Sequence, residues 1–242
     1  FSSPGNNRKR DIAFGRFMKN FLKSNRAIFW TFFLLAAFLF ALLNRTEWGV
    51  LKLRSFSNDI DVEAGERRIE RKFGEAEFEN LNDASISIYK KERELILKAN
   101  DKEIEKYNIS LGRHPLNHKT QSGDGRTPVG EYSIVTRNYR SNYHLFLGID
   151  YPKPADAKRG LDAGIIDEKT YNEFLRNYEE GNISEMWGTE LGGAIGIHGT
   201  GNVQAAGDWT EGCIAVSNAE IEELWAVAKI GTTVRIYEHI LS

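Results

Sequence analysis

The most pronounced pattern along the chain is an uncharged, apolar run close to its beginning. Residues 27–43 read AIFWTFFLLAAFLFALL, 17 positions without a charge, and a helix of that length measures about 25 Å, near the minimum that crosses a bilayer core. Residues 1–26 before it hold seven Lys or Arg and one acidic residue. The positive-inside rule then predicts a basic cytoplasmic tail over 1–26, a transmembrane helix over 27–43 and a chain that continues outside the cytoplasm.

A buried core helix and a cleaved signal peptide are the two alternatives for the apolar run. Core helices seldom lack polar residues over so many turns. A signal peptide has the same basic and apolar layout, but its apolar part is usually shorter, and residues 44–48 (NRTEW) lack an Ala-x-Ala cleavage pattern. We therefore expect an anchor that is not cleaved.

Residues 44–82 are rich in charge and irregular in pattern. A helix is predicted within them over 62–78, which reads VEAGERRIERKFGEAEF. We interpret 44–82 as a charged juxtamembrane stalk or a packing helix, with its run of charges facing solvent.

Beyond this segment, the pattern changes to short alternating runs separated by polar turns. Such runs predict strands joined as an antiparallel meander. The predicted strands cover residues 85–89, 95–99, 104–111, 130–137, 143–149, 194–198 and 232–237.

Helices are predicted at two places between these strands. Residues 156–182 read as a helical insertion or lid, in which Asp167 caps a helix that runs to Tyr178. Ser217 begins a Ser-x-x-Glu capping box, which opens a second helix. Residues 83–240 are thus predicted to form one domain that is mainly β with helical insertions.

Composition narrows the classes of function. The chain has 242 residues, of which 41% are hydrophobic, and a formal net charge of −2. Dedicated nucleic-acid-binding proteins are usually clearly basic, so this class is disfavoured. Cys213 is the only cysteine, which excludes an intrachain disulfide framework and a multi-cysteine metal centre. If Cys213 has a chemical role, it acts as a free thiol.

The densest set of reactive residue types lies between His198 and the run GDWTEGCIAV at 207–216, which contains Cys213. A neutral imidazole within hydrogen-bond reach of a thiol can take its proton and leave a thiolate–imidazolium pair that attacks carbonyl carbons. Gly212 permits close backbone approach, so the amides of Gly212 and Cys213 are candidates for an oxyanion hole. Taken alone, an inert buried cysteine and a structural histidine explain these residues at least as well.

Two blocks of the sequence resemble the L,D-transpeptidase (YkuD-type) catalytic domains. In one, His198 is followed after 14 residues by Cys213 within Thr-x-Gly-Cys-Ile-Ala-Val, and the family signature has a histidine, a similar spacer and then Ser/Thr-His-Gly-Cys. In the other, residues 119–132 (KTQSGDGRTPVGEY) are similar to the family's Gly-x-x-x-Thr-Pro-x-Gly-x-Tyr/Phe segment. The blocks occur in the family's order, and the resemblance covers about residues 84–240. Residues 137–145 resemble the YafK-like branch of murein L,D-transpeptidases and hydrolases.

The resemblance implies a mixed-sheet β-sandwich of the L,D-transpeptidase type and a role for individual residues. The implied roles are nucleophile for Cys213, general base for His198, orientation of the imidazole for the Gly199 carbonyl, oxyanion stabilisation for Gly212, loop orientation for Thr210, and substrate binding for Tyr143, His144 and Arg126. An alternating strand and an exposed turn account equally well for the last three. The chain departs from the family pattern at Glu211, where the signature has a histidine.

The implied activity is that of a membrane-anchored cysteine acyltransferase. It would act on the L,D peptide bonds of peptidoglycan stem peptides through a thioester, in cell-wall cross-linking or protein attachment. A hydrolase of the same family, which releases wall-linked protein or stem residues, and a non-catalytic wall-binding module remain alternatives. A papain-like peptidase fits less well, because in that group the cysteine precedes its histidine.

The resemblance, taken together with the apolar run and the charge of the chain, implies partners and a location. The expected partners are peptidoglycan stem peptides, a wall-linked protein and the membrane through residues 27–43, with no nucleic acid. Neither a metal nor another cofactor is expected. The expected location is the bacterial cytoplasmic (inner) membrane, with a single pass and the catalytic domain on the periplasmic side.

Overall fold

The computed structural model describes residues 60–74, 83–100, 102–204 and 206–240. The predicted cytoplasmic tail, the predicted transmembrane helix and most of the predicted stalk lie outside these ranges. Among the helices within them, none has the length and apolar character needed to cross a membrane.

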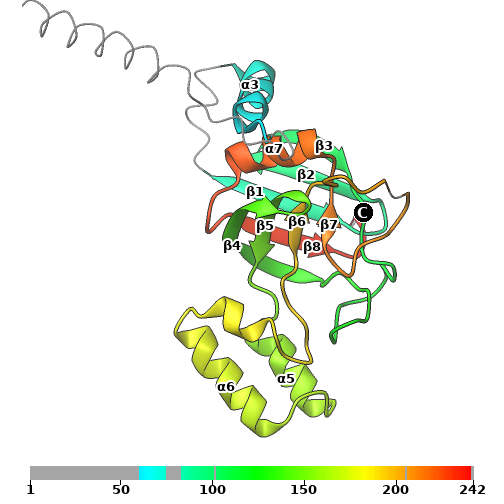
Figure 1. Ribbon diagram of the computed structural model, residues 1–242, viewed down its shortest axis with the longest axis vertical. Helices are drawn as coiled ribbons and strands as arrows, with labels where there is room; N and C mark the ends of the chain where they lie inside the picture. Colours follow the sequence, from blue (N-terminus) through cyan, green and yellow to red (C-terminus); the bar gives the residue numbers. More distant parts are fainter. Residues whose placement is uncertain (1–59, 75–82, 101, 205, 241–242) are drawn as a thin grey trace, which may run out of the picture. The chain divides into compact units, whose positions relative to one another are not determined.

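Eight strands of the described residues form one sheet in the order β3-β2-β1-β8-β4-β5-β6-β7. Their bounds are β1 (Ala84–Tyr89), β2 (Glu94–Ala99), β3 (Lys102–Asn108), β4 (Gly130–Ser141), β5 (His144–Ile149), β6 (Gly196–His198), β7 (Ile214–Ala215) and β8 (Thr233–Tyr237). The pairs β1–β8 and β6–β7 are parallel and the others are antiparallel. The sheet is therefore mixed, as expected, and the final strand inserts between β1 and β4 instead of extending a meander (Figure 1).

Strand β4 joins the two halves of the sheet and explains how it curls. Its first residues, 130–133, pair with β8, whereas the stretch from Ile134 onward pairs with β5. The register shifts between Ile134 and Thr136, and such irregularities bend a strand. Buried residues from both halves of the sheet belong to one hydrophobic core. The two halves are parts of one continuous sheet and share this core.

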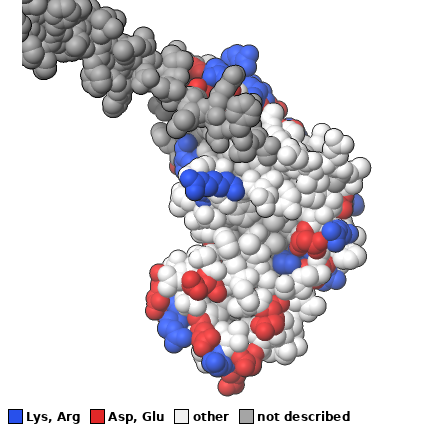
Figure 2. All heavy atoms as spheres, viewed as in Figure 1, with Lys and Arg blue, Asp and Glu red and all other residues white. Residues whose placement is uncertain are grey.

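The predicted helical insertion is present and has a small core of its own. It consists of α5 (Pro154–Asp162), α6 (Glu168–Glu179) and the 3₁₀ helix η1 (Ile183–Met186). Asp167 caps α6 as predicted, because its carboxylate accepts the backbone N–H of Thr170 at 2.8 Å. The core of the insertion is formed by the buried side chains of Ala157, Ile166, Phe174, Met186 and Leu191. On the face drawn in Figure 2, acidic and basic side chains are intermixed over this insertion.

Helix α7 (Asn218–Val227) opens with the predicted capping box and packs against α3 (Val62–Phe73). Gly65 allows this packing, because a Cβ there would collide with the backbone of Glu222. α3 ends before the predicted position, at Gly74. Its charged face is only partly solvated, since Arg68 and Lys72 bind carboxylates of α7.

Candidate active site

Two short parallel strands bring Cys213 and His198 to one face of the sheet. Ile197 of β6 lies opposite Ile214 of β7, and His198 lies opposite Ala215. Cys213 directly precedes β7, so it comes beside Gly196, and a hydrogen bond joins it to the Gly196 backbone. Since side chains alternate along a strand, Cys213 and His198 point to the same face, two positions apart.

The imidazole of His198 is buried and has a defined orientation. The residue is 2% exposed, and its Nδ1 lies 2.7 Å from the carbonyl oxygen of Gly199. A carbonyl only accepts hydrogen bonds, so Nδ1 carries the proton and Nε2 presents a lone pair. Burial lowers the pKa of His198, although the Gly199 carbonyl acts in the opposite direction. At neutral pH the ring is therefore uncharged and able to accept a proton.

The sulfur of Cys213 rests as a thiol. Its Sγ lies 3.5 Å from the carbonyl oxygen of Ala194, to which it donates. Burial raises the pKa of Cys213 to about 11, while the Gly196 backbone hydrogen bond and the positive charge of Lys119 lower it. The resting pair is thus a neutral thiol and a neutral imidazole, in place of the ion pair considered from the sequence.

The loop before Cys213 is held by Thr210. The Thr210 hydroxyl donates to the carbonyl oxygen of Cys213 at 2.7 Å and accepts the N–H of Gly212 at 3.2 Å. Position 212 requires glycine, because φ is +131° and a Cβ would lie 2.5 Å from the Arg126 carbonyl oxygen. The Gly212 amide is occupied by Thr210, so the Cys213 amide becomes the better candidate for stabilising an oxyanion.

Three aromatic side chains surround His198. The Tyr143 ring stacks on the imidazole, with centroids 4.6 Å apart and planes inclined by 26°. Trp209 meets it edge-on at 5.7 Å, and Phe146 lies at 6.5 Å. The Phe146 ring also lies over Gly196, where a Cβ would come within 2.7 Å of it. These rings shield the imidazole from water and give the face beside Cys213 an apolar lining.

The remaining predicted site residues lie at different distances from this centre. Arg126 contacts the nucleophile loop through its backbone, at Gly212. His144 is 3% exposed and its Nε2 lies 2.8 Å from a carboxylate oxygen of Glu222, so its side chain lies beneath the surface that carries Tyr143. Glu211 is exposed and paired with Arg113 at 2.7 Å. This ion pair balances the charge of the carboxylate two residues before Cys213.

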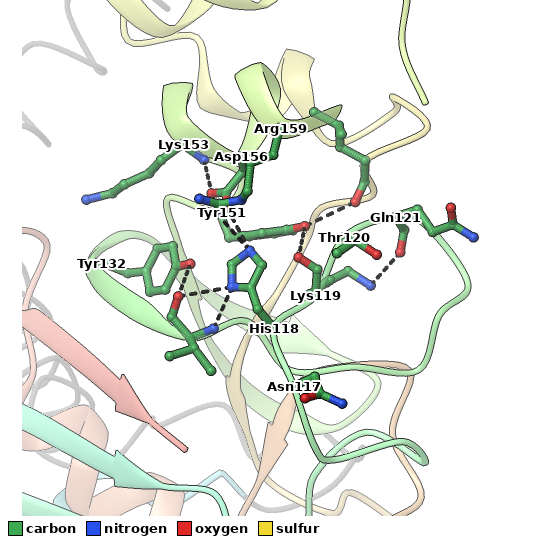
Figure 3. A network of polar contacts seen from close by, with 12 residues as sticks. Asn117, His118, Lys119, Thr120, Gln121, Tyr132, Tyr151, Lys153, Asp156 and Arg159 are labelled. Carbon is green, nitrogen blue, oxygen red and sulfur yellow. Dashed lines mark hydrogen bonds and ion pairs between the residues drawn. The ribbon is translucent and has the colours of Figure 1, made fainter. Parts of the chain in front are cut away.

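A further polar network lies between residues 117–121 and α5 (Figure 3). His118 accepts the N–H of Val129 at Nδ1, and its Nε2 lies 2.9 Å from Asp156. A pocket of about 430 Å³ opens beside it. Its lining residues are His118, Lys119, Thr120, Asp156, Arg159, Gly160, Asp162, Ala163 and Ile165. Within the described ranges, His, Cys, Asp and Glu side chains form no group of three that could hold a metal ion.

Four residues near the centre were not singled out from the sequence. Trp209 and Phe146 carried no motif beyond their places in the nucleophile run and a predicted strand. Lys119 begins the block that resembles the family segment, but its charge beside Cys213 arises only from folding. Ala194 has a positive φ of 52°, which no pattern of residue types indicates for alanine.

The chain was compared with protein families, with curated sequences and with solved structures. The model of the YkuD L,D-transpeptidase catalytic domain matches residues 83–236. No curated protein sequence matches the chain.

Several solved structures are similar to the chain. Pgp2, the helical cell shape determining protein from Campylobacter jejuni, is 20% identical with a TM-score of 0.45, over 75% of this chain and 57% of Pgp2. Bd1075 from Bdellovibrio bacteriovorus is 19% identical with a TM-score of 0.45, over 67% of this chain and 50% of that one. An L,D-transpeptidase from Xylanimonas cellulosilytica is 16% identical with a TM-score of 0.38, over 64% and 60%. The chain thus spans only 50–60% of the length of these proteins.

Proposed function

Because this chain belongs to the family of L,D-transpeptidase (YkuD) catalytic domains, we propose that it is a cysteine acyltransferase that acts on the L,D peptide bonds of peptidoglycan stem peptides. One observation carries the proposal: the β6–β7 register puts Cys213 and an uncharged, oriented His198 on one face of the sheet. This is the nucleophile-and-base arrangement that acyl transfer needs.

The first half of the reaction forms a thioester. Nε2 of His198 takes the proton of the Cys213 thiol as the sulfur attacks the carbonyl carbon of the stem, and a tetrahedral oxyanion forms. The Cys213 amide is the candidate donor to this oxyanion. The intermediate collapses when the C–N bond breaks, and His198 returns the proton to the departing amine of the D-residue.

The second half of the reaction breaks the thioester and regenerates the Cys213 thiol. An amine of another stem, or of a wall-linked protein, loses a proton to His198 and attacks the thioester carbon. The C–S bond breaks and the sulfur recovers its proton from His198. With water as the acceptor, the same steps make the enzyme a hydrolase.

We also propose that the domain acts outside the cytoplasm, anchored by residues 27–43. The length of this uncharged run and the basic residues before it support a single span with the domain on the periplasmic side. Such an anchor would keep the site close to a wall polymer that does not diffuse.

The test uses the full chain in detergent with purified tetrapeptide muropeptides. A Cys213→Ala variant prepared in the same way is the control. Chromatography and mass spectrometry should show a cross-linked dimer, or exchange of the terminal residue for an added D-amino acid, with the parent chain alone. A shortened stem without exchange assigns the hydrolase. Equal product with parent and variant, or a parent that forms no thioester and changes no muropeptide, refutes catalysis and favours a wall-binding module.

A further inference from the structure

A chain of contacts leads from α7 to the imidazole of His198, and it starts at the buried residue Glu222. This residue is 6% exposed, and both of its carboxylate oxygens are occupied. Oε1 lies 2.8 Å from Nε2 of His144 and accepts the N–H of Asp61 at 3.1 Å. Oε2 accepts Nη2 of Arg68 at 2.8 Å. Asp61 caps the start of α3 and Arg68 lies in the middle of this helix, so α3 holds the carboxylate against His144.

His144 adopts a backbone conformation that few residues other than glycine adopt. Its φ is +75°, which lies in the left-handed region and costs free energy for a residue with a Cβ. Such a conformation persists only when surrounding contacts hold it. The side chain is 3% exposed, and among the described residues its ring has one polar partner, Glu222, because Nδ1 is left without any. Glu222 is thus the polar contact that anchors this residue.

Tyr143 directly precedes His144 in the chain. Asn142 and Tyr143 form the turn between β4 and β5, and Ser141 pairs with His144 across it. From this turn the Tyr143 ring stacks on His198 at 4.6 Å.

The backbone of the same turn supports the loop after His198. A Cβ on Gly201 would lie 2.5 Å from the Asn142 carbonyl oxygen and 3.0 Å from the Cα of Tyr143. The turn and the loop that follows the base are thus packed without space between them.

We propose that Glu222 is a positioning residue for the active site. It holds His144 in the left-handed conformation, and this places the Tyr143 ring on one face of His198, where the ring orients the imidazole and excludes water. The inference rests on the proposed function only for the role of His198 as the base. Its neighbour Glu223 binds Arg68, Lys72 and Tyr107, and in the part of the chain that the structure describes no hydrogen bond or ion pair joins it to His144.

Glu223 therefore provides a matched control. Glu222→Leu and Glu223→Leu each remove one carboxylate, 6% and 5% exposed, from the contact between α3 and α7, but only the first releases His144. The readout is the titration of His198 in the full chain in detergent, followed by NMR of labelled histidine and assigned with His198→Gln.

Burial lowers the pKa of His198 and the Gly199 carbonyl raises it, and no charged group among the described residues contributes to the shift. If Glu222 acts through Tyr143, Glu222→Leu exposes the ring and its pKa rises towards the ordinary value of 6.5. Glu223→Leu leaves it unchanged. An unchanged pKa in Glu222→Leu, or an equal rise in both variants, overturns the proposal.

Two further variants apply if Glu222→Leu does not fold. His144→Ala leaves the Arg68–Glu222 pair in place, and Tyr143→Ala removes a ring that is 39% exposed. Both should raise the pKa of His198, and the double variant should show no further rise, because both act at one contact. Additive rises, or no rise with either, overturn the proposal.

The titration does not depend on any substrate. If it behaves as expected while muropeptides remain unchanged, the positioning role stands and the proposed function fails. If muropeptides are processed, Glu222→Leu should lower kcat/KM about tenfold, which is the scale of losing one well-packed aromatic contact. The acid limb of its pH profile should move to higher pH, whereas that of Glu223→Leu should not.

Discussion

The rate at which an alkylating agent modifies Cys213 directly measures how much of this thiol is ionised in the folded protein. Burial raises the pKa of this thiol to about 11, and only the thiolate is alkylated. At pH 7 such a thiol is ionised to about one part in 10⁴, against about 3% for an unperturbed cysteine, so the rate constant should be lower by about 300-fold. The rate should keep rising with pH until about pH 11.

The assay is simple because the chain contains one cysteine. Intact-mass spectrometry after timed exposure to iodoacetamide gives the rate constant, and the same chain unfolded in guanidinium chloride provides the unperturbed reference. His198→Ala should leave the folded rate low, since the imidazole is not holding a preformed ion pair. A folded rate at pH 7 that equals the unfolded one, or a plateau below pH 8, would refute the resting neutral pair.

Three further substitutions have defined outcomes in urea denaturation. Gly212→Ala puts a Cβ 2.5 Å from the Arg126 carbonyl oxygen at a φ of +131°, so the free energy of unfolding should fall by about 2 kcal/mol; no change would mean that the loop relaxes freely. Lys90→Met leaves two carbonyl oxygens and Glu238 without the buried ammonium that binds them. It should lower the same free energy by about 3 kcal/mol, and a loss below 1 kcal/mol would contradict this. Glu211→Gln breaks an ion pair whose side chains are 62% and 64% exposed, and the change should stay below about 0.5 kcal/mol; a larger loss would show that the pair is more than a surface contact.

Elements with a local signal were predictable from the sequence. Asp167 and Ser217 cap helices through side chains that reach backbone amides three residues away, so each signal lies within one turn. The strands at 85–89 and 95–99 were also recognised within one residue, the first from its alternating pattern and the second from its apolar residues, most of which are buried. The motif around Cys213 and His198 was recognisable because it is compact.

Features that depend on long-range pairing were not predictable. The last strand, β8, inserts beside β1, some 150 positions away in the chain, and no local pattern specifies that partner. The predicted strand over 104–111 ends at Asn108. Beyond it the chain no longer pairs with β2, and Ser110 instead forms a bridge with Ala215, two residues after Cys213. The burial of His144 was not predictable for a similar reason, because its side chain pairs with the carboxylate of Glu222, 78 positions later in the chain.

Cys213, the proposed nucleophile, is held less by the sheet than by contacts around it. Strand β7 has two residues, and such a ladder alone cannot hold a loop against thermal motion. Instead, Thr210 ties the loop to the Cys213 carbonyl, and Asp208 binds both the amide of Leu111 and the guanidinium of Arg93. Because these contacts lie at the edge of the main core, weakening them should loosen the active site before it unfolds the domain. His198, the proposed base, lies in contrast on β6 between two paired strands, so it is held more rigidly than Cys213. In the proposed reaction it is the sulfur that turns from the Ala194 carbonyl towards the imidazole.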